Sequence, residues 1–247
     1  MTASTAIRPA IITTSWDDGH PLDERLHELL CRHGIAATYY VPTACDRAVM
    51  DGAALRRLTA AGAEIGGHTT THRLLTTLDD ATALAEMRDN RLHLEQLLGT
   101  AVPTFCYPGG YFSRRLMRLA RTAGYARART TMGLRTDLGD DPYALPVTVQ
   151  VYPHGRAIHL RHALKEGNFS GIGSWLRLGT PATVTAMAER AMQRLASEGG
   201  VFHLWGHSWE LDECQLWPLL DQVLAIIGKR PDCTYLTNAA AYPRSGL

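Results

Sequence analysis

The sequence predicts an α/β fold in which parallel strands form a (β/α) barrel. Short apolar runs rich in β-branched residues alternate with longer amphipathic segments seven or eight times along the chain, and this alternation is typical of a parallel sheet flanked by helices. The length of 247 residues suits one such barrel, and a hydrophobic fraction of 45% is sufficient for its core. We therefore expect a single domain over residues 1–247.

Apolar runs bounded by turn residues mark the predicted strands, which cover residues 10–16, 37–41, 64–67, 102–107, 125–131, 145–151, 200–205 and 234–237. The predicted helices begin at a capping residue or a proline and end at or near a glycine. They cover residues 21–34, 51–61, 79–98, 113–123, 180–197 and 213–227.

Residues 152–179 break this alternation. They carry His154, His159 and His162 together with three arginines and a glycine-rich stretch. One interpretation is a surface helix and loop. The other is a lid or rim, inserted into the domain, that selects the substrate.

Charge and cysteine usage narrow the class of protein. The formal net charge is +1 without a long run of like charge, so neither nucleic acid nor an anionic membrane is indicated as a partner. Residues 1–9 lack the apolar stretch of a signal peptide, and no apolar run is long enough to span a membrane. The five cysteines are widely spaced and odd in number, which favours a reducing compartment. We expect a cytoplasmic protein.

Two short motifs supply the side chains of a metal site. Asp17 and Asp18 follow the first predicted strand, and His68 and His72 follow the third. Histidines four residues apart reach one metal ion when their segment is helical or turn-like, and one carboxylate completes a set that leaves positions open for water and substrate. Adjacent aspartates on an extended chain point in opposite directions, so one can bind the metal while the other acts as a base.

Each motif alone has a simpler explanation. A chain with 11 histidines contains an H-x-x-x-H spacing by chance, and D-D-G is common in turns and at helix starts. Their joint placement at the carboxyl ends of predicted strands favours a site, because α/β folds bind ligands at that edge. The side chains are those of a metal-assisted hydrolase.

The same motifs resemble those of the polysaccharide deacetylases of carbohydrate esterase family four. Residues 15–19, S-W-D-D-G, match the family's first motif, and residues 68–72, H-T-T-T-H, match its second. The resemblance covers most of the chain and implies a distorted (β/α) barrel of seven or eight strands. It also implies that Asp17 is the general base and that Asp18, His68 and His72 bind one divalent metal ion. Zinc is the default metal, and cobalt, nickel and iron are alternatives.

Residues 105–110, F-C-Y-P-G-G, resemble the family's third motif, R-x-P-x-G. The resemblance implies that the N–H of Gly109 binds an oxyanion, and it makes Tyr107 a candidate substrate contact. Cys106 stands where the family has the arginine that holds the base. Arg129 and Arg135 are candidates to replace that arginine.

Residues 201–210 carry two histidines. Strand alternation makes His203 a candidate core residue, whereas His207 follows the strand at the catalytic edge. The family's fifth motif ends in a histidine at this place, which implies that His207 is the general acid, with His203 as the alternative. Glu210, Trp209 and His203 are candidate substrate contacts, and Glu210 is also a candidate to orient His207.

The residues predict a metal-dependent hydrolase. The family resemblance implies that it removes an N-acetyl group from an amino sugar and releases acetate and a free amine. The expected location favours a soluble or lipid-linked amino-sugar substrate over a cell-wall polymer. One alternative is a hydrolase of a non-sugar amide, formamide or cyclic imide on the same scaffold. The other is a non-catalytic glycan-binding barrel, which the cysteine at position 106 favours and the intact aspartates and histidines disfavour.

Overall fold

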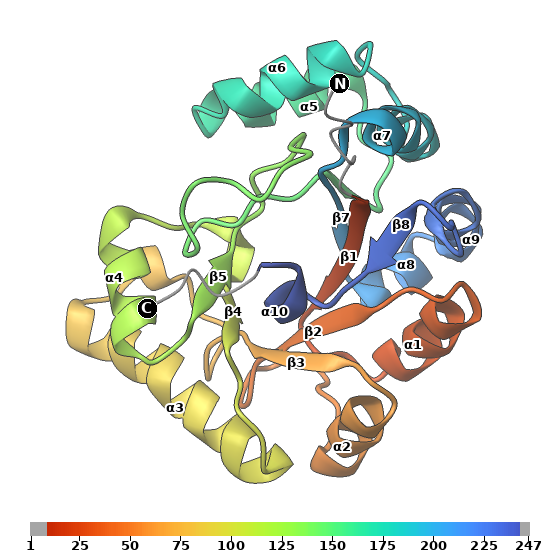
Figure 1. The fold of residues 1–247 in the computed structure, drawn as a ribbon. Helices are drawn as coiled ribbons and strands as arrows, with labels where there is room; N and C mark the ends of the chain where they lie inside the picture. Colours follow the sequence, from red (N-terminus) through yellow and green to blue (C-terminus); the bar gives the residue numbers. More distant parts are fainter. Residues whose placement is uncertain (1–8, 243–247) are drawn as a thin grey trace, which may run out of the picture.

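A curled parallel sheet forms the centre of the protein (Figure 1). The computed structural model describes residues 9–242, so residues 1–8 of the N-terminal stretch considered above lie outside the described residues. The strand order is β5-β4-β3-β2-β1-β7-β6, with β8 paired to β1. The strands are β1 (Ala10–Asp17), β2 (Ala37–Val41), β3 (Glu64–Gly67), β4 (Thr104–Cys106), β5 (Arg127–Arg129), β6 (Val149–Gln150), β7 (Val201–Gly206) and β8 (Cys233–Tyr235). The predicted distorted barrel is confirmed, in the form of a half-barrel rather than a closed ring.

Strand β1 organises the sheet because it pairs with three other strands. Most of its length lies beside β7, while its first residues pair with β8 and its last four pair with β2. The register sets Asp17 opposite Tyr40, near the end of β2. Because these pairs are parallel, the loops that follow β1, β3, β4 and β7 gather at one edge of the sheet.

Helices surround the sheet (Figure 1). The main ones are α1 (Asp23–Arg32), α2 (Gly52–Ala60), α3 (Asp80–Leu98), α4 (Arg114–Thr122), α7 (Val184–Glu198) and α9 (Trp217–Ile227). Asp51, Asp79 and Ser113 accept backbone N–H bonds at the starts of α2, α3 and α4, which satisfies donors that the helix itself leaves unpaired. Gly99 ends α3 with a φ of 69°, which glycine adopts without strain.

Two helices differ from their predicted limits. The helix predicted over residues 180–197 begins only at Val184, because Thr183 accepts the N–H of Ala186 and caps it. The helix predicted over residues 213–227 begins only at Trp217, as α9, and a separate helix that was not predicted, α8 (Ser208–Glu213), precedes it. Pro218 lies in the first turn of α9, where proline favours a new start. The short elements α10 (Asn238–Ala241), η1 (Leu75–Thr77) and η2 (Pro108–Gly110) complete the described chain.

An irregular segment joins the two edge strands, β5 and β6. The N–H of Thr130 donates to the carbonyl of Leu145 beside β5, and the N–H of Thr148 donates to the carbonyl of His203 in β7. The predicted strand over residues 145–151 therefore divides its hydrogen bonds between two neighbours. Only two of its residues remain in β6.

Residues 152–179 form two packed helices, α5 (Arg156–Lys165) and α6 (Phe169–Arg177), which we call the α5–α6 hairpin (Figure 1). Asn168 caps α6 by accepting the N–H of Gly171, and its side-chain amide donates to the carbonyl of Gly133. The hairpin is thereby attached to the loop after β5. None of the helices within residues 9–242 combines the length and apolar composition needed to cross a membrane.

Candidate functional site

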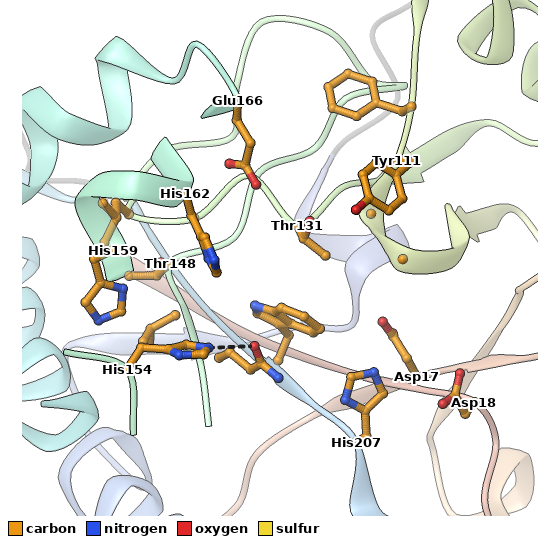
Figure 2. Close-up of a pocket in the computed structure, with 18 of the residues that line it drawn as sticks. Asp17, Asp18, Tyr111, Thr131, Thr148, His154, His159, His162, Glu166 and His207 are labelled. Carbon is orange, nitrogen blue, oxygen red and sulfur yellow. Dashed lines mark hydrogen bonds between the residues drawn. The ribbon is translucent and has the colours of Figure 1, made fainter. Parts of the chain in front are cut away.

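A cavity of about 660 Å³ opens at the carboxyl edge of the sheet (Figure 2). The loops after β1, β3, β4, β5 and β7 line it together with helix α5. Seven residues predicted from the sequence lie on its wall, namely Asp17, Asp18, His68, His72, Gly109, His207 and Trp209. The fold therefore brings together motifs that are far apart in the chain.

The chain turns sharply where β1 ends. Asp17 is the last residue of β1, and Asp18 adopts a φ of 77°, followed by Gly19 at 59°. Both carboxylates are buried at 4% exposure, yet both reach the cavity wall. Their partners differ, because Asp18 meets two histidines whereas Asp17 meets an arginine.

Asp18, His68 and His72 form the candidate metal site. The Nε2 atoms of the two histidines are 3.2 Å apart, and they lie 3.5 Å and 3.1 Å from Oδ1 of Asp18. The Nδ1 atom of His68 lies 2.8 Å from the carbonyl oxygen of Cys106. Because a carbonyl only accepts, Nδ1 carries the proton and Nε2 presents its lone pair to the site.

These three side chains fit a divalent metal ion. The Oδ1 atom of Asp18 is buried without a hydrogen-bond partner, and three ligand atoms converge within 4.8 Å of one another. Burial raises the pKa of Asp18, but its interactions with His68 and His72 lower the pKa by more. The pKa of Asp18 therefore lies below its usual range. An anionic oxygen beside two imidazole nitrogens is a donor set that suits zinc and other first-row divalent ions.

The histidine pair lies on a loop rather than a helix. Thr69 and His72 have positive φ angles of 66° and 59°. The hydroxyl of Thr69 accepts the N–H of His72 at 3.0 Å. The carboxylate of Glu86 in α3 accepts the N–H and the hydroxyl of Thr71 at 2.8 Å and 2.6 Å. These side-chain bonds fix the turn and bring the two imidazoles together without a helical turn.

Arg129 holds Asp17. Its guanidinium is completely buried and forms an ion pair with Oδ1 of Asp17. The guanidinium also lies over the rings of Tyr40 and Trp205, at 5.3 Å and 5.0 Å from their centroids. Arg135 instead pairs with the exposed Asp137. Of the two arginines considered from the sequence, Arg129 is therefore the one that contacts the candidate base.

The register of β4 and β5 places Arg129 beside the cysteine at position 106. Cys106 and Arg129 are direct partners across the two strands, so their side chains lie at the same level and about one strand spacing apart. The Sγ atom of Cys106 lies 3.6 Å from Oδ2 of Asp17. Burial raises the pKa of the Cys106 thiol well above its usual value. The thiol is therefore neutral and unsuited to bind a metal with Asp17.

Trp209 and Arg47 hold the other oxygen of Asp18. The indole N–H of Trp209 donates to Oδ2 of Asp18 at 2.9 Å. Arg47 stacks over the Trp209 ring at 4.2 Å and lies 3.5 Å from the same oxygen. Trp209, predicted as a substrate contact, thus also orients a candidate metal ligand. Arg47 belongs to no motif, and nothing in the sequence indicated it.

His207 lies beside the two aspartates on the cavity floor (Figure 2). Its Nδ1 atom is 3.4 Å from Oε2 of Glu210, and Gln150 donates to that same oxygen at 2.9 Å. Burial lowers the pKa of His207, but Glu210 and the charges of Asp17 and Asp18 raise it more, so its pKa lies above the usual value. Glu210 therefore lies beside the ring that it is predicted to orient. Gln150 was not predicted.

Gly109 lies on the cavity wall in a turn that requires a positive φ of 63°. The N–H of the next residue, Gly110, donates to the carbonyl of Tyr107 at 2.9 Å and closes the turn. A Cβ atom on Gly109 would approach Tyr111 and Leu74 to 3.1 Å and 3.2 Å. Glycine therefore suits this position for both conformation and space.

Three residues predicted as substrate contacts, Glu210, His203 and Tyr107, are not part of the cavity wall. The last two are also deeply buried. His203 is 1% exposed and its Nε2 lies 2.8 Å from the hydroxyl of Ser15, which corresponds to the core histidine considered from the sequence. Tyr107 is completely buried, and its hydroxyl donates to the carbonyl of Tyr143. Both side chains are enclosed by the protein, so we do not assign them substrate contacts.

The wall opposite the candidate metal site carries three histidines that were not predicted as site residues. His154, His159 and His162 all line the cavity (Figure 2). The ring of His154 lies 6.0 Å from that of His159 and 5.8 Å from that of His162. Burial lowers the pKa of His154 and His159, and the neighbouring imidazoles lower it further. His154 and His159 therefore give this wall two imidazoles that are mostly neutral near pH 7.

Sequence comparison assigns the first half of the chain to a family. A model of the family described as polysaccharide deacetylase matches residues 6–128, which include the aspartate pair and the histidine pair. A chitin deacetylase from Pestalotiopsis sp is 32% identical over 126 residues, which are 50% of this chain and 41% of that protein. The chain thus matches less than half of the length of that relative.

Structural comparison extends the likeness to nearly the whole chain. The chitin deacetylase from the fungal pathogen Colletotrichum lindemuthianum has a TM-score of 0.59 at 17% identity, with 94% of this chain and 87% of that chain covered. The family 4 carbohydrate esterase from Streptomyces lividans, solved with acetate, has a TM-score of 0.55 at 16% identity, with 93% of each chain covered. At these identities the likeness establishes the fold. The family model over residues 6–128 and the related chitin deacetylase sequence identify the chain as a member of the polysaccharide deacetylase family.

Proposed function

We propose that the protein is a metal-dependent hydrolase that removes an N-acetyl group from an amino sugar and releases acetate and a free amine. The observation that carries this proposal is the convergence of Asp18, His68 and His72 beside a separately held aspartate. Membership of the polysaccharide deacetylase family supports a carbohydrate amide as the substrate class.

Asp17 serves as the general base. A divalent ion held by Asp18, His68 and His72, by default zinc, would act as a Lewis acid and lower the pKa of a water molecule in the site. Arg129 fixes Oδ1 of Asp17, and Oδ2, whose other neighbour is the weak thiol donor of Cys106, accepts a proton from the attacking water. The N–H of Gly109 donates to the amide oxygen as negative charge develops there.

His207 serves as the general acid. Its raised pKa keeps a larger share of the imidazole protonated near neutral pH, so it can donate a proton to the departing amine. Glu210, itself bonded by Gln150, orients the ring. Base and acid thus have different electrostatic surroundings, as two proton-transfer groups in one site require.

The cavity wall supports a sugar-sized substrate. Trp205, Trp209, Tyr111 and Phe112 contribute aromatic faces between the polar groups, and pockets of this kind enclose small polar ligands. The five cysteines are free thiols, which supports our proposal that the protein acts in the reducing cytoplasm.

Acetate release from a panel of N-acetylated substrates tests the proposal. The panel spans monosaccharides, nucleotide sugars, lipid-linked amino sugars and chito-oligomers, offered to apo protein reloaded with zinc, cobalt or nickel. Asp17→Asn should abolish acetate release, whereas Asp46→Asn, at an exposed position, should leave it unchanged. Metal-dependent hydrolysis of formamides or cyclic imides, without acetate release, would show that the substrate is a non-sugar amide or imide. Glycan binding without any turnover would show that the protein is a binding protein and not an enzyme.

A further inference from the structure

Exposed apolar side chains concentrate on the α5–α6 hairpin. Within residues 9–242, the large hydrophobic residues with high exposure are Leu74, Leu92, Tyr111, Leu160, Leu164, Phe169 and Leu176. Four of these seven lie on the hairpin, and Phe169 and Leu176 are 72% and 61% exposed. A single exposed leucine needs no explanation, but a gathered apolar surface indicates an interaction site.

On α5 the apolar residues form a stripe with basic residues on both sides. Leu160 and Leu164 are four residues apart and share one face. At about 100° per residue, Arg156 lies on one side of this stripe and Arg161 on the other. The cavity-lining His159 lies farther around the helix. The same helix thus presents one face to the cavity and another to the solvent.

Helix α6 repeats the pattern. Phe169 and Leu176 are exposed on the outer face, Ile172 is half-buried against the core, and Trp175 is buried. Arg177 is exposed next to them. Both helices of the hairpin therefore expose large apolar side chains with basic residues beside them.

The hairpin is more basic than the protein as a whole. Residues 156–177 contain four basic residues (Arg156, Arg161, Lys165 and Arg177) and one acidic residue (Glu166), a net charge of +3 against +1 for the whole chain. All five are exposed. The net charge of the whole chain did not indicate an anionic membrane as a partner, because acidic residues elsewhere offset the positive charge of the hairpin.

We propose that the α5–α6 hairpin docks on an anionic lipid bilayer. Its apolar face would enter the boundary between headgroups and acyl chains, and its arginines and lysine would meet the anionic headgroups. The surface continues to the cavity mouth, because Lys165 lines the cavity and lies 5.9 Å above the ring of Tyr111, which is itself 50% exposed. Docking would bring the cavity mouth to the membrane surface without a membrane span.

Charge favours a bilayer over a second copy of this chain. In a twofold dimer through this surface, the basic hairpin of one chain would face the basic hairpin of the other. Like charges brought together oppose such an interface, whereas anionic headgroups neutralise them.

Vesicle sedimentation tests the proposal on the full chain. Vesicles of phosphatidylcholine with phosphatidylglycerol are compared with vesicles of phosphatidylcholine alone, at low and high salt. We expect binding to the anionic vesicles that high salt weakens. The double variant Phe169→Ser/Leu176→Ser and the variant Arg161→Glu should each lose about tenfold or more of this binding. Leu92→Ser on α3 and Arg118→Glu on α4 are matched exposed controls that should bind as the wild type does.

The outcomes separate membrane docking from the proposed catalysis. The hairpin variants should retain turnover of a soluble substrate, because Phe169, Leu176 and Arg161 lie outside the cavity wall. Equal binding to both kinds of vesicle, no vesicle binding, or equal loss in the control variants would each overturn the proposal. Sedimentation velocity that shows a dimer, lost in the Phe169→Ser/Leu176→Ser variant, would assign the surface to a second copy instead.

Discussion

Replacing Arg129 with methionine tests how the base is held. The variant leaves Asp17 buried without the cation that compensates its charge. At a separation of about 4 Å and an effective dielectric constant of about 20, such a pair interacts by about 4 kcal/mol. Removing one partner of a buried ion pair typically destabilises a protein by about 3–5 kcal/mol. We expect a lower Tm and, near pH 7, a kcat/KM reduced by about 10²- to 10⁴-fold, the usual contribution of a general base.

The assay is acetate release over a pH series, with bound metal measured in every sample. Arg135→Met removes an arginine that pairs with the exposed Asp137 and should change kcat/KM little. The double variant Asp17→Asn/Arg129→Met should be more stable than Arg129→Met alone, because it leaves no unpaired charge.

An exchange variant makes the test specific. Cys106 and Arg129 are partners across neighbouring strands, so Cys106→Arg/Arg129→Cys moves the guanidinium to the place that the family motif gives it. We expect the kcat/KM of this exchange variant to be at least tenfold higher than that of Arg129→Met. A folded, metal-loaded Arg129→Met protein with kcat/KM within about threefold of the wild type would refute the role of Arg129.

Three other predictions concern the remaining groups. Glu210 raises the pKa of His207, so Glu210→Gln should lower that pKa and move the alkaline limb of the kcat/KM profile to lower pH; an unmoved limb would exclude His207 as the acid. His72→Ala should reduce the bound metal per chain, measured by mass spectrometry, by about tenfold or more, and unchanged metal content would argue against the assigned ligands. Burial raises the pKa of Asp23 well above its usual value. The protonated Asp23 carboxyl therefore favours the folded state at low pH, and this stabilisation is lost as the pH rises toward the folded-state pKa. Asp23→Asn should therefore raise Tm more at about pH 8 than at about pH 5, and an equal change at both would contradict this reasoning.

The sequence predicted those parts of the site that lie within continuous motifs. Asp17 and Asp18 are adjacent, and His68 and His72 are four residues apart, so spacing and strand placement indicated them. The order of strands and helices was predictable for the same reason, because each element has its own apolar period and its own end signals.

Residues that reach the site through tertiary contacts were not predictable in the same way. Arg129 contacts Asp17 only because the register of β4 and β5 sets it beside Cys106, and no spacing in the sequence encodes that register. Arg47 and Gln150 reach Asp18 and Glu210 from loops and an edge strand without a motif. Strand alternation, by contrast, was enough to indicate that His203 could be a core residue.

The most direct test of the central claim measures acetate release against metal bound per chain, for the wild type and for Asp17→Asn. The variant keeps Asp18, His68 and His72, so it should still bind one metal ion. We predict that wild-type activity rises in proportion to bound metal and levels off at one ion per chain, while Asp17→Asn binds the ion and releases no acetate. Acetate release by metal-free protein, or full activity in Asp17→Asn, would contradict the assignment of these residues.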